Sequence, residues 1–454
     1  MLYKVGRVLF FCAALTALGF ALYRDLTIGS LYPMDLRNRV VGARLMHDGI
    51  SPYFYKWKAG DPVRYYDPYN FNGYKVSIMT ASPFFHLLME PLAELPQWKI
   101  QYWWVAIQYL VLSAMVLLSL AMIDGLRGKF MVLIFALLFL YTDAWKLAIQ
   151  NGQNYIFIPF LAMCVYFALV RMPATPIWAV AAGTCSILLV LIRPNALVFF
   201  LPALFLLWDF GRVRLIAFFI PVLLLAGWTL ANPHQRALWK DYYVNIGEQE
   251  KIHHYLHPTE QINAPDPCYY DWEGMHGPKI DPFAENLPLQ VHTEIGNVFY
   301  LESLIFKWNM PISLLLSALA VVLLVLTALY YFSVRRSQSI RWVVFDPATT
   351  LIFGYCLYMI ADLFSPIVRN QYYTVQILFL VLLSPGVPWL SGKWVQTAML
   401  VGIILNITHF SFVKMQHTIG EYLVIGTITL YSLLNNHKPR EWRQQSSLAQ
   451  APQD

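Results

Sequence analysis

The sequence predicts an all-α polytopic membrane protein with about twelve transmembrane helices. Hydrophobic residues make up 58% of its 454 residues and charged residues only 13%, and the mean hydropathy is +0.50. Soluble globular chains carry roughly 25% charged residues. Apolar runs of roughly 20 residues, long enough to cross a bilayer as a helix, recur along the whole chain.

These runs define the predicted transmembrane segments. They cover approximately residues 5–23, 101–121, 129–147, 154–171, 175–192, 195–209, 214–231, 310–332, 347–364, 371–385, 394–411 and 419–435. We assign them to a single domain, residues 1–435, followed by a polar tail at 436–454. No small-x-small cleavage motif follows the first run, because Tyr23 and Arg24 are bulky, so we interpret it as a retained anchor rather than a signal peptide.

Basic residues predict how the chain is oriented, since short loops rich in Lys and Arg stay cytoplasmic. With twelve segments, the basic clusters in short loops fall on one side: Lys4, Arg7, Arg127, Lys129, Arg171, Arg212, Arg214, Arg335, Arg336, Arg341, Lys393 and the tail. Lys414 is the exception. Two long loops, at about 24–100 and 233–309, then lie on the extracytoplasmic face and contain juxtamembrane helices. The net charge of +6 is explained by the cytoplasmic loops, so we expect no nucleic-acid partner.

The first long loop begins with the candidate catalytic residue, Asp35. Leu36, Val40 and Ala43 recur at helical spacing after it, which predicts an amphipathic helix lying in the membrane interface. A carboxylate in the first turn of a helix is favoured in its ionised form by the helix dipole. Asp35 is therefore a candidate general base, and the alternative is that it only caps the helix.

Basic and aromatic residues surround this acid. Arg39 lies with Arg37 and Arg44 in a stretch that suits an anionic headgroup or a phosphate, although interfacial arginines also snorkel. Tyr53 and Tyr66 belong to a segment rich in Tyr and Trp. Such residues orient sugars, but they also form the interface belts of membrane proteins.

Later outer turns supply further candidates. Gln153 and Asn154 open the fourth segment, where an amide pair binds substrate or caps the helix. Arg193, before Pro194, interrupts an apolar run, and a charge at that depth marks an anion site, with phosphate the simplest ligand. Arg369 is a second cation for the same phosphate. It is followed by further candidate substrate-binding residues: Asn370, Gln371 and Tyr372.

We predict no metal site and no cofactor. His253 and His257 have the spacing of a helical metal site, with His254 beside them, but no acid ligand is suitably placed. The five cysteines give no metal-binding or disulfide pattern. Because nucleotide-binding motifs are also missing from the sequence, the energy for any reaction must come from an already activated substrate.

The order of these motifs resembles glycosyltransferase family 87, whose members are polytopic enzymes of the GT-C class. The family shows an acid after the first span, then a small-residue helix ending in Gly and Pro-Tyr, here Asp35, Ala43, Gly49 and Pro52-Tyr53. Pro91-Leu92-Ala93-Glu94-Leu95-Pro96, Gly152-Gln153, Arg193-Pro194 and Ser365-Pro366 follow in the family's order, up to about Leu383. The chain departs from the family in having Arg193 where Lys is more usual. It also has Arg369 to Tyr372 where Trp and His often follow the Ser-Pro turn.

The resemblance implies a GT-C fold and an inverting transfer of a hexose or pentose, mannose favoured, from a polyprenyl-phosphate donor. Asp35 would be the base that activates a lipid or glycan acceptor on the extracytoplasmic face of the cell membrane. Arg193 and Arg369 would bind the donor phosphate, so that no metal is required. Two alternatives remain open: a transporter or flippase of a lipid-linked sugar, and a glycan ligase or polymerase that uses a diphosphate-linked donor.

Overall fold

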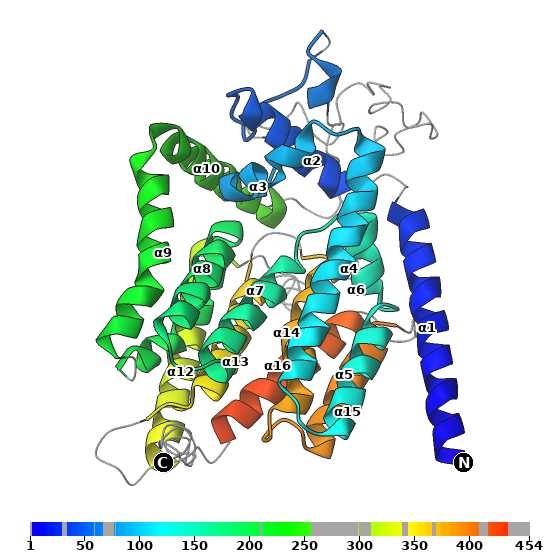
Figure 1. The fold of residues 1–454 in the computed structure, drawn as a ribbon. Coiled ribbons are helices and arrows are strands. Elements are labelled where there is room, and N and C mark those ends of the chain that lie inside the picture. The colour runs from blue at the N-terminus through cyan, green and yellow to red at the C-terminus, as the bar shows by residue number, and fades with distance from the viewer. Residues whose placement is uncertain are drawn as a thin grey trace, which may run out of the picture.

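The computed structural model describes residues 2–29, 34–58, 60–66, 77, 79–208, 211–255, 298, 310–337, 344–365, 369–407 and 416–434. Every regular element within these ranges is helical, and no strand occurs in them. The all-α prediction is therefore confirmed for this part of the chain (Figure 1). The tail at 436–454 and most of the second long loop lie outside the described residues.

The helices follow the predicted segments closely. In the first half they are α1 (Leu2–Gly29), α2 (Met34–His47), α3 (Pro83–Ala93), α4 (Gln97–Ala121), α5 (Leu126–Phe139), α6 (Asp143–Gln150), α7 (Phe157–Tyr166) and α8 (Pro176–Ile192). In the second half they are α9 (Arg212–Ala231), α10 (Pro233–Tyr255), α12 (Ile312–Ser337), α13 (Pro347–Leu363), α14 (Leu378–Leu383), α15 (Lys393–Ile404) and α16 (Gln416–Leu434).

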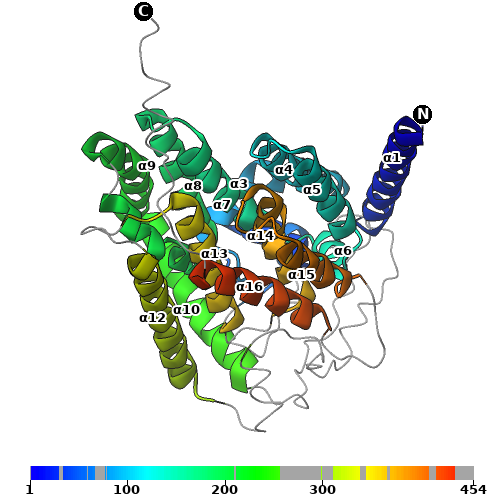
Figure 2. The same cartoon turned by 90° about the horizontal axis from the view of Figure 1, so that it is seen from below.

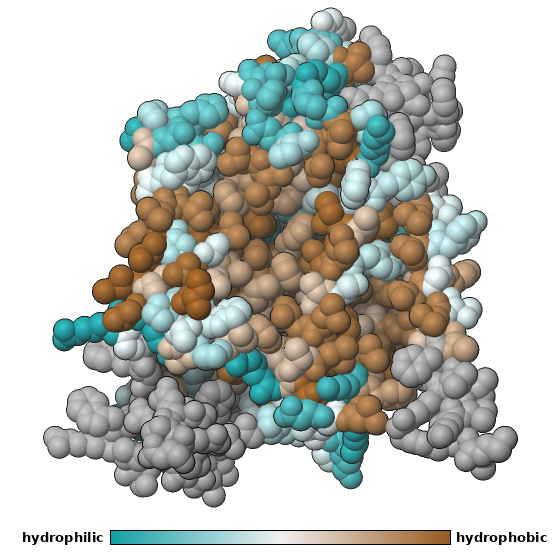
Figure 3. All heavy atoms as spheres, viewed as in Figure 1, coloured by the Kyte–Doolittle hydropathy of each residue, from teal (hydrophilic) through white to brown (hydrophobic). Residues whose placement is uncertain are grey.

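Three of these helices are long and apolar enough to cross a membrane: Lys99–Ala121, Arg212–Ala231 and Ile312–Ser337. A fourth crossing is added if α5 and α6, which meet at an angle of 56°, form one bent span. These helices indicate a membrane-associated protein. Figure 3 shows a broad apolar surface between more hydrophilic ends, as expected for a face in contact with lipid.

Four of the predicted spans are not single α-helices. Residues 129–147 are covered by α5 and α6, and residues 154–171 by α7 and the π-helical segment η2 (Phe167–Arg171). Residues 195–209 are covered by two 3₁₀ segments, η3 (Pro194–Phe200) and η4 (Pro202–Trp208). Residues 371–385 are covered by the 3₁₀ segment η5 (Gln371–Ile377), then α14 and η6 (Ser384–Gly386). A 3₁₀ helix rises about 2.0 Å per residue against about 1.5 Å for an α-helix, so these short segments extend further than α-helices of equal length. Long 3₁₀ runs are uncommon and often mark functional positions.

Three helices, α2, α3 and α10, gather at one end of the bundle, at the top of Figure 1. The predicted helix after Asp35 exists, but it does not lie open to the membrane interface as expected. Val40 and Ala43 pack with Phe85 and Trp104 on one side. Other α2 side chains pack with a second cluster that includes Tyr53 and Tyr242. Because protein covers both sides, Arg37, Arg39 and Arg44 are buried rather than spread over a solvated face.

Arg44 binds the backbone of the Pro-Leu-Ala-Glu-Leu-Pro stretch at residues 91–96, where α3 ends. Its guanidinium donates to the carbonyls of Ala93 at 2.7 Å, Arg64 at 3.2 Å and Leu95 at 3.4 Å. A cation is favourable at the C-terminus of a helix, where the last carbonyls have no partner within the helix. Arg44 therefore caps α3 and ties it to α2.

Two helices occupy contrasting positions in the bundle. Helix α1 stands at its edge in both views (Figures 1 and 2), and Leu15 and Phe20 on it are exposed. Helix α13 lies in the interior, and almost all of its residues are buried. The end of α13 and the start of η5 reach the site described next.

Candidate functional site

The site begins at the turn between α6 and α7. Gly152 has a φ of 64°, a left-handed conformation that glycine adopts without strain. Its N–H donates to the carbonyl of Ile149 at 3.1 Å, and the N–H of Gln153 donates to that of Ala148 at 2.8 Å. This pair of bonds is a Schellman cap. The cap leaves the carbonyl of Asn151 to accept the N–H groups of Asp35 and Leu36, each at 3.1 Å, so the turn holds the start of α2.

Gln153 joins the predicted base to a predicted basic residue. Its Nε2 donates to Oδ2 of Asp35, and its Oε1 accepts a bond of 2.6 Å from Nη2 of Arg39. Nη1 of Arg39 donates to the carbonyl of Gly152 at 3.0 Å. Gln108 on α4 in turn donates to the carbonyl of Gln153. Gln153 is buried while Asp35 is only partly buried, so the amide fixes a carboxylate that keeps access to the surface.

An aromatic stack leads away from this pair. The phenol of Tyr372 interacts electrostatically with Asp35 and Arg39. Its oxygen accepts a hydrogen bond of 3.1 Å from Nδ2 of Asn370. Its ring stacks on Tyr155, with centroids 5.7 Å apart, and on Tyr373, with centroids 5.2 Å apart. Hydrogen bonds thus join Asp35, Gln153 and Arg39, and Asn370 and Tyr372 form a second bonded pair within electrostatic range of them.

Arg193 lies at the far side of the stack. Its guanidinium carbon is 5.5 Å from the ring centroid of Tyr155 and 5.7 Å from that of Tyr373. Nη2 donates to Oδ1 of Asp362 at 2.8 Å, and 21% of the side chain is exposed. Within the described part of the chain, Nε of Arg193 and Nε of Arg39 are buried N–H donors with no acceptor. Buried donors of this kind normally have a partner, so both are suited to an anionic ligand.

Arg369 has a different environment. Its side chain is 1% exposed, and its Nε donates to Oδ2 of Asp362 at 3.0 Å. Nη1 and Nη2 donate to the two carboxylate oxygens of Glu421 at 2.6 and 2.5 Å. All three guanidinium nitrogens are thus engaged with carboxylates. This geometry does not support the prediction that Arg369 binds phosphate directly. Arg369 instead holds Asp362, which holds Arg193.

Asp362 and Glu421 were missed by reasoning from the sequence. Both are fully buried acids within predicted spans, and the expense of an intramembrane charge, applied to Arg193 but not to acids, would have identified them. Asp362 also accepts bonds from Asn195 at 3.3 Å and Gln376 at 3.2 Å. The two arginines and two acids form a neutral buried network that joins η3, α13, η5 and α16.

The other predicted residues lie apart from this group or contribute backbone contacts. Tyr53 is buried and donates to the carbonyl of Ala81 at 2.9 Å, and Tyr66 packs edge-on against Trp57. Asn154 accepts the N–H of Phe157 through its backbone, and Gln371 is buried at the start of η5. Their predicted roles in substrate binding remain predictions.

The histidine cluster is outside the description. The side chains of His253 and His254, and the whole of His257, lie among residues that the structure does not describe. No group of three or more His, Cys, Asp or Glu side chains in the described ranges is placed to hold a metal ion.

No protein-family model, curated protein or solved structure matches the chain. The likeness to glycosyltransferase family 87 therefore rests on the ordered motifs in the sequence. The new observation is that several of these motifs, far apart along the chain, contact one another.

Proposed function

We propose that the protein is a GT-C-type membrane glycosyltransferase similar to family 87. It transfers a hexose or pentose, mannose favoured, from a polyprenyl-phosphate donor to a lipid or glycan acceptor on the extracytoplasmic face of the cell membrane, and about twelve helical segments cross that membrane. The main support is the bridge that Gln153 makes between Asp35 and Arg39, with the aromatic stack leading to Arg193. It supplies a carboxylate, cationic donors and flat ring faces within one group of contacts.

In this mechanism the carboxylate of Asp35 accepts the proton of an acceptor hydroxyl. The hydroxyl oxygen attacks the anomeric carbon from the face opposite the phosphate, so the configuration inverts. The bond between the anomeric carbon and the phosphate oxygen breaks, and its electron pair leaves with the polyprenyl phosphate. A general base of this kind contributes about 10²- to 10⁴-fold to a rate. The Gln153 amide keeps the carboxylate in position.

The leaving phosphate gains negative charge as its bond to the sugar breaks. Arg193 is the best-placed cation to stabilise that charge, because it is partly exposed and its Nε has no acceptor in the described structure. The second unpaired donor, Nε of Arg39, lies on the Asp35 side. Tyr155 and Tyr373 are buried in the aromatic stack, whereas Tyr372 is partly exposed and can pack against a sugar.

Product analysis tests the proposal. Purified protein is incubated with polyprenyl-phosphate sugars, diphosphate-linked glycans and candidate acceptors. The expected result is a new glycosidic bond of inverted configuration and free polyprenyl phosphate, with Asp35→Asn inactive. The proposal fails if the sugar always stays on its original carrier. A product made only from diphosphate-linked donors would indicate the glycan ligase or polymerase instead.

One observation favours a second candidate, a transporter or flippase of a lipid-linked sugar. Such proteins place paired charges at interrupted helices. Arg193 follows the end of α8 and Arg369 precedes η5, and both pair with Asp362. The two candidates differ in outcome, because a transporter moves the intact lipid-linked sugar across a vesicle membrane without changing its carrier.

A further inference from the structure

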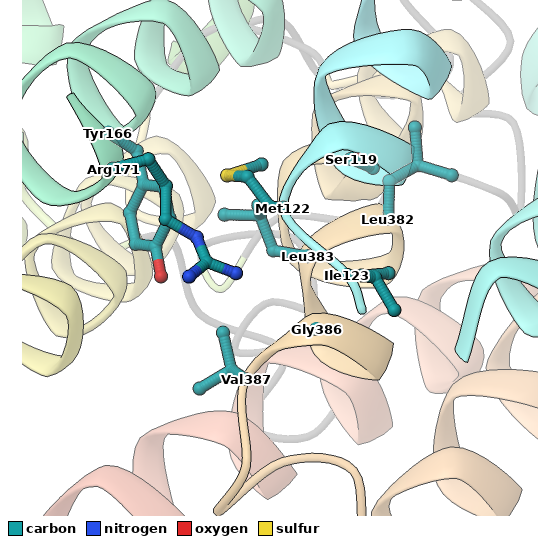
Figure 4. Close-up of a pocket in the computed structure, with 9 residues that line it drawn as sticks. All are labelled: Ser119, Met122, Ile123, Tyr166, Arg171, Leu382, Leu383, Gly386 and Val387. Carbon is teal, nitrogen blue, oxygen red and sulfur yellow. The ribbon is translucent and has the colours of Figure 1, made fainter. Parts of the chain in front are cut away.

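A second candidate site lies at the end of the bundle opposite α2. Here a hollow of about 560 Å³ is lined by Asp124 from the α4–α5 turn, Arg127 from the first turn of α5, Arg171 from the end of the π-helical segment η2 (Phe167–Arg171), and Ser391 and Gln396 near the start of α15. We call it the inner pocket. Small-molecule pockets commonly measure about 300–1,000 Å³, so its volume suits a lipid headgroup. A smaller hollow of about 10 Å³ shares Met122, Ile123, Arg171 and Gly386 with the inner pocket, and Figure 4 shows the residues that line this smaller hollow.

The charge of the inner pocket suits an anion. In Figure 4 the guanidinium of Arg171 reaches into the space between Met122 and Val387. Arg171 and Arg127 are exposed, and within the described part of the chain neither forms an ion pair or hydrogen bond through its side chain. Asp124 is the one acid among the lining residues, so two positive charges face one negative charge.

The pocket also offers an acceptor for a hydroxyl group. Gln396 donates through Nε2 to Ser384 Oγ at 3.1 Å and to the carbonyl of Leu390 at 2.9 Å. These bonds fix the amide, and its Oε1 is buried with no partner among the described residues. A fixed acceptor that lacks a donor matches a hydroxyl on the ligand.

The surface beside the pocket is apolar and exposed. Leu117 on α4 and Leu126 at the start of α5 are each 65% exposed, and Met131 lines the pocket itself. A lipid with its headgroup in the pocket can lay its acyl chains over these side chains. A free anion would make no use of them.

We propose that the inner pocket binds the phosphate of an anionic phospholipid whose headgroup carries hydroxyl groups. Arg127 and Arg171 contact the phosphate, Gln396 accepts a headgroup hydroxyl, and the acyl chains lie along α4 and α5. This site is separate from the Asp35 site, and its occupation does not depend on sugar transfer.

Native mass spectrometry of the full chain in detergent tests the assignment. The probes are phosphatidylglycerol, phosphatidic acid, phosphatidylcholine and inorganic phosphate. The double variant R127Q/R171Q should bind phosphatidylglycerol at least about tenfold more weakly, because it removes both cations that contact the phosphate. R212Q/R335Q removes the same charge from other exposed positions and should bind normally. R127K/R171K should retain most of the binding.

Three outcomes would overturn the proposal. One is unchanged binding by R127Q/R171Q, and another is an equal loss in R212Q/R335Q, which would indicate attraction by overall charge. The third is displacement of the lipid by inorganic phosphate at equal concentration, because the pocket would then be a free-anion site. If R127Q/R171Q does not fold, Gln396→Leu provides the test: weaker binding of phosphatidylglycerol with unchanged binding of phosphatidic acid supports the headgroup assignment, and equal binding of both opposes it.

Discussion

Two acids near the end of the first predicted span, Asp25 and Asp35, have opposite surroundings. Asp25 in α1 is fully buried and accepts bonds from Tyr109 at 2.7 Å, Trp145 at 2.7 Å and Arg24 at 2.8 Å. Asp35 is partly buried and held by the side-chain amide of Gln153. A carboxylate enclosed by fixed donors stabilises the fold, whereas one that is oriented and still accessible can exchange a proton with a substrate.

The difference also explains the position of α1. This helix lies at the edge of the bundle, and the bonds from Tyr109 on α4 and Trp145 on α6 attach it near its end. Arg24 adds a bond of 2.7 Å to the carbonyl of Leu140. Asp25 thus joins three helices, while Asp35 begins the group that ends at Arg193.

The largest loss of stability is expected from Asp25→Ala. It leaves Trp145 Nε1, the Tyr109 hydroxyl and Arg24 without their acceptor, and breaking a buried charge pair costs about 3–5 kcal/mol. Thermal unfolding in detergent measures the effect. Glu90→Ala, which breaks the exposed contact with His47, is the control and should leave thermal stability almost unchanged. Equal losses in the two variants would show that Asp25 is not a structural tie.

Arg193→Gln should lower sugar transfer about 10²- to 10³-fold, the effect of removing one donor to a developing oxyanion. It should also lower thermal stability, because buried Asp362 then keeps only Arg369 as a cation. Arg369→Gln should act mainly on thermal stability, because it leaves the carboxylates of Asp362 and Glu421 buried without their shared cation. The measurements are single-turnover transfer and thermal unfolding of both variants. Normal transfer by Arg193→Gln would remove it from the phosphate site.

His86, which packs against α2, should make the stability of the fold depend on pH. Its ring is buried against α2, Nδ1 lies 3.1 Å from the carbonyl of Arg39, and burial lowers its pKa to about 4. Between pH 6.5 and about 4 the unfolded chain binds a proton that the folded chain does not, so stability is complete above pH 6.5 and falls as the pH decreases. The shift corresponds to about 3 kcal/mol.

Thermal unfolding from pH 4 to 8 tests this dependence. His86→Gln should flatten the acid limb of the stability profile, since glutamine does not titrate. If the wild type and His86→Gln lose stability in parallel over the whole pH range, the role of His86 is contradicted. An unchanged acid limb in the variant would show that other groups cause the acid sensitivity.

The smallest expected effect concerns the bridge itself. Gln153→Ala removes the amide but leaves both charges, and we expect transfer to fall about tenfold through poorer orientation of Asp35. Gln101→Ala replaces a different buried glutamine, on α4, and should leave transfer unchanged. Equal activities of the two variants would mean that the bridge does not orient the base.

Local features of this fold could be predicted from the sequence. Helical periodicity identified the helix that follows Asp35, and Gly152 marked the turn that carries Gln153. The break at Arg193-Pro194 was also visible, because proline excludes a continuous helix. Each of these signals lies within a few neighbouring residues.

Features that depend on distant partners could not be predicted. The α2 pattern looked amphipathic, but α3 and residues near Tyr53 and Tyr242 cover it, which no local periodicity indicates. The same limit explains why Arg369 was predicted to be a free cation. Its acids are supplied by α13 and α16, and only the folded chain brings them together.

In the proposed mechanism Asp35, and not Asp25, takes the proton of the acceptor hydroxyl. The direct test is transfer from a polyprenyl-phosphate sugar by purified Asp35→Asn and Asp25→Asn, compared at equal amounts of folded protein. We expect Asp35→Asn to lose about 10²- to 10⁴-fold in rate with unchanged thermal stability, and Asp25→Asn to transfer normally but to unfold at a lower temperature. Near wild-type transfer by Asp35→Asn would contradict the account.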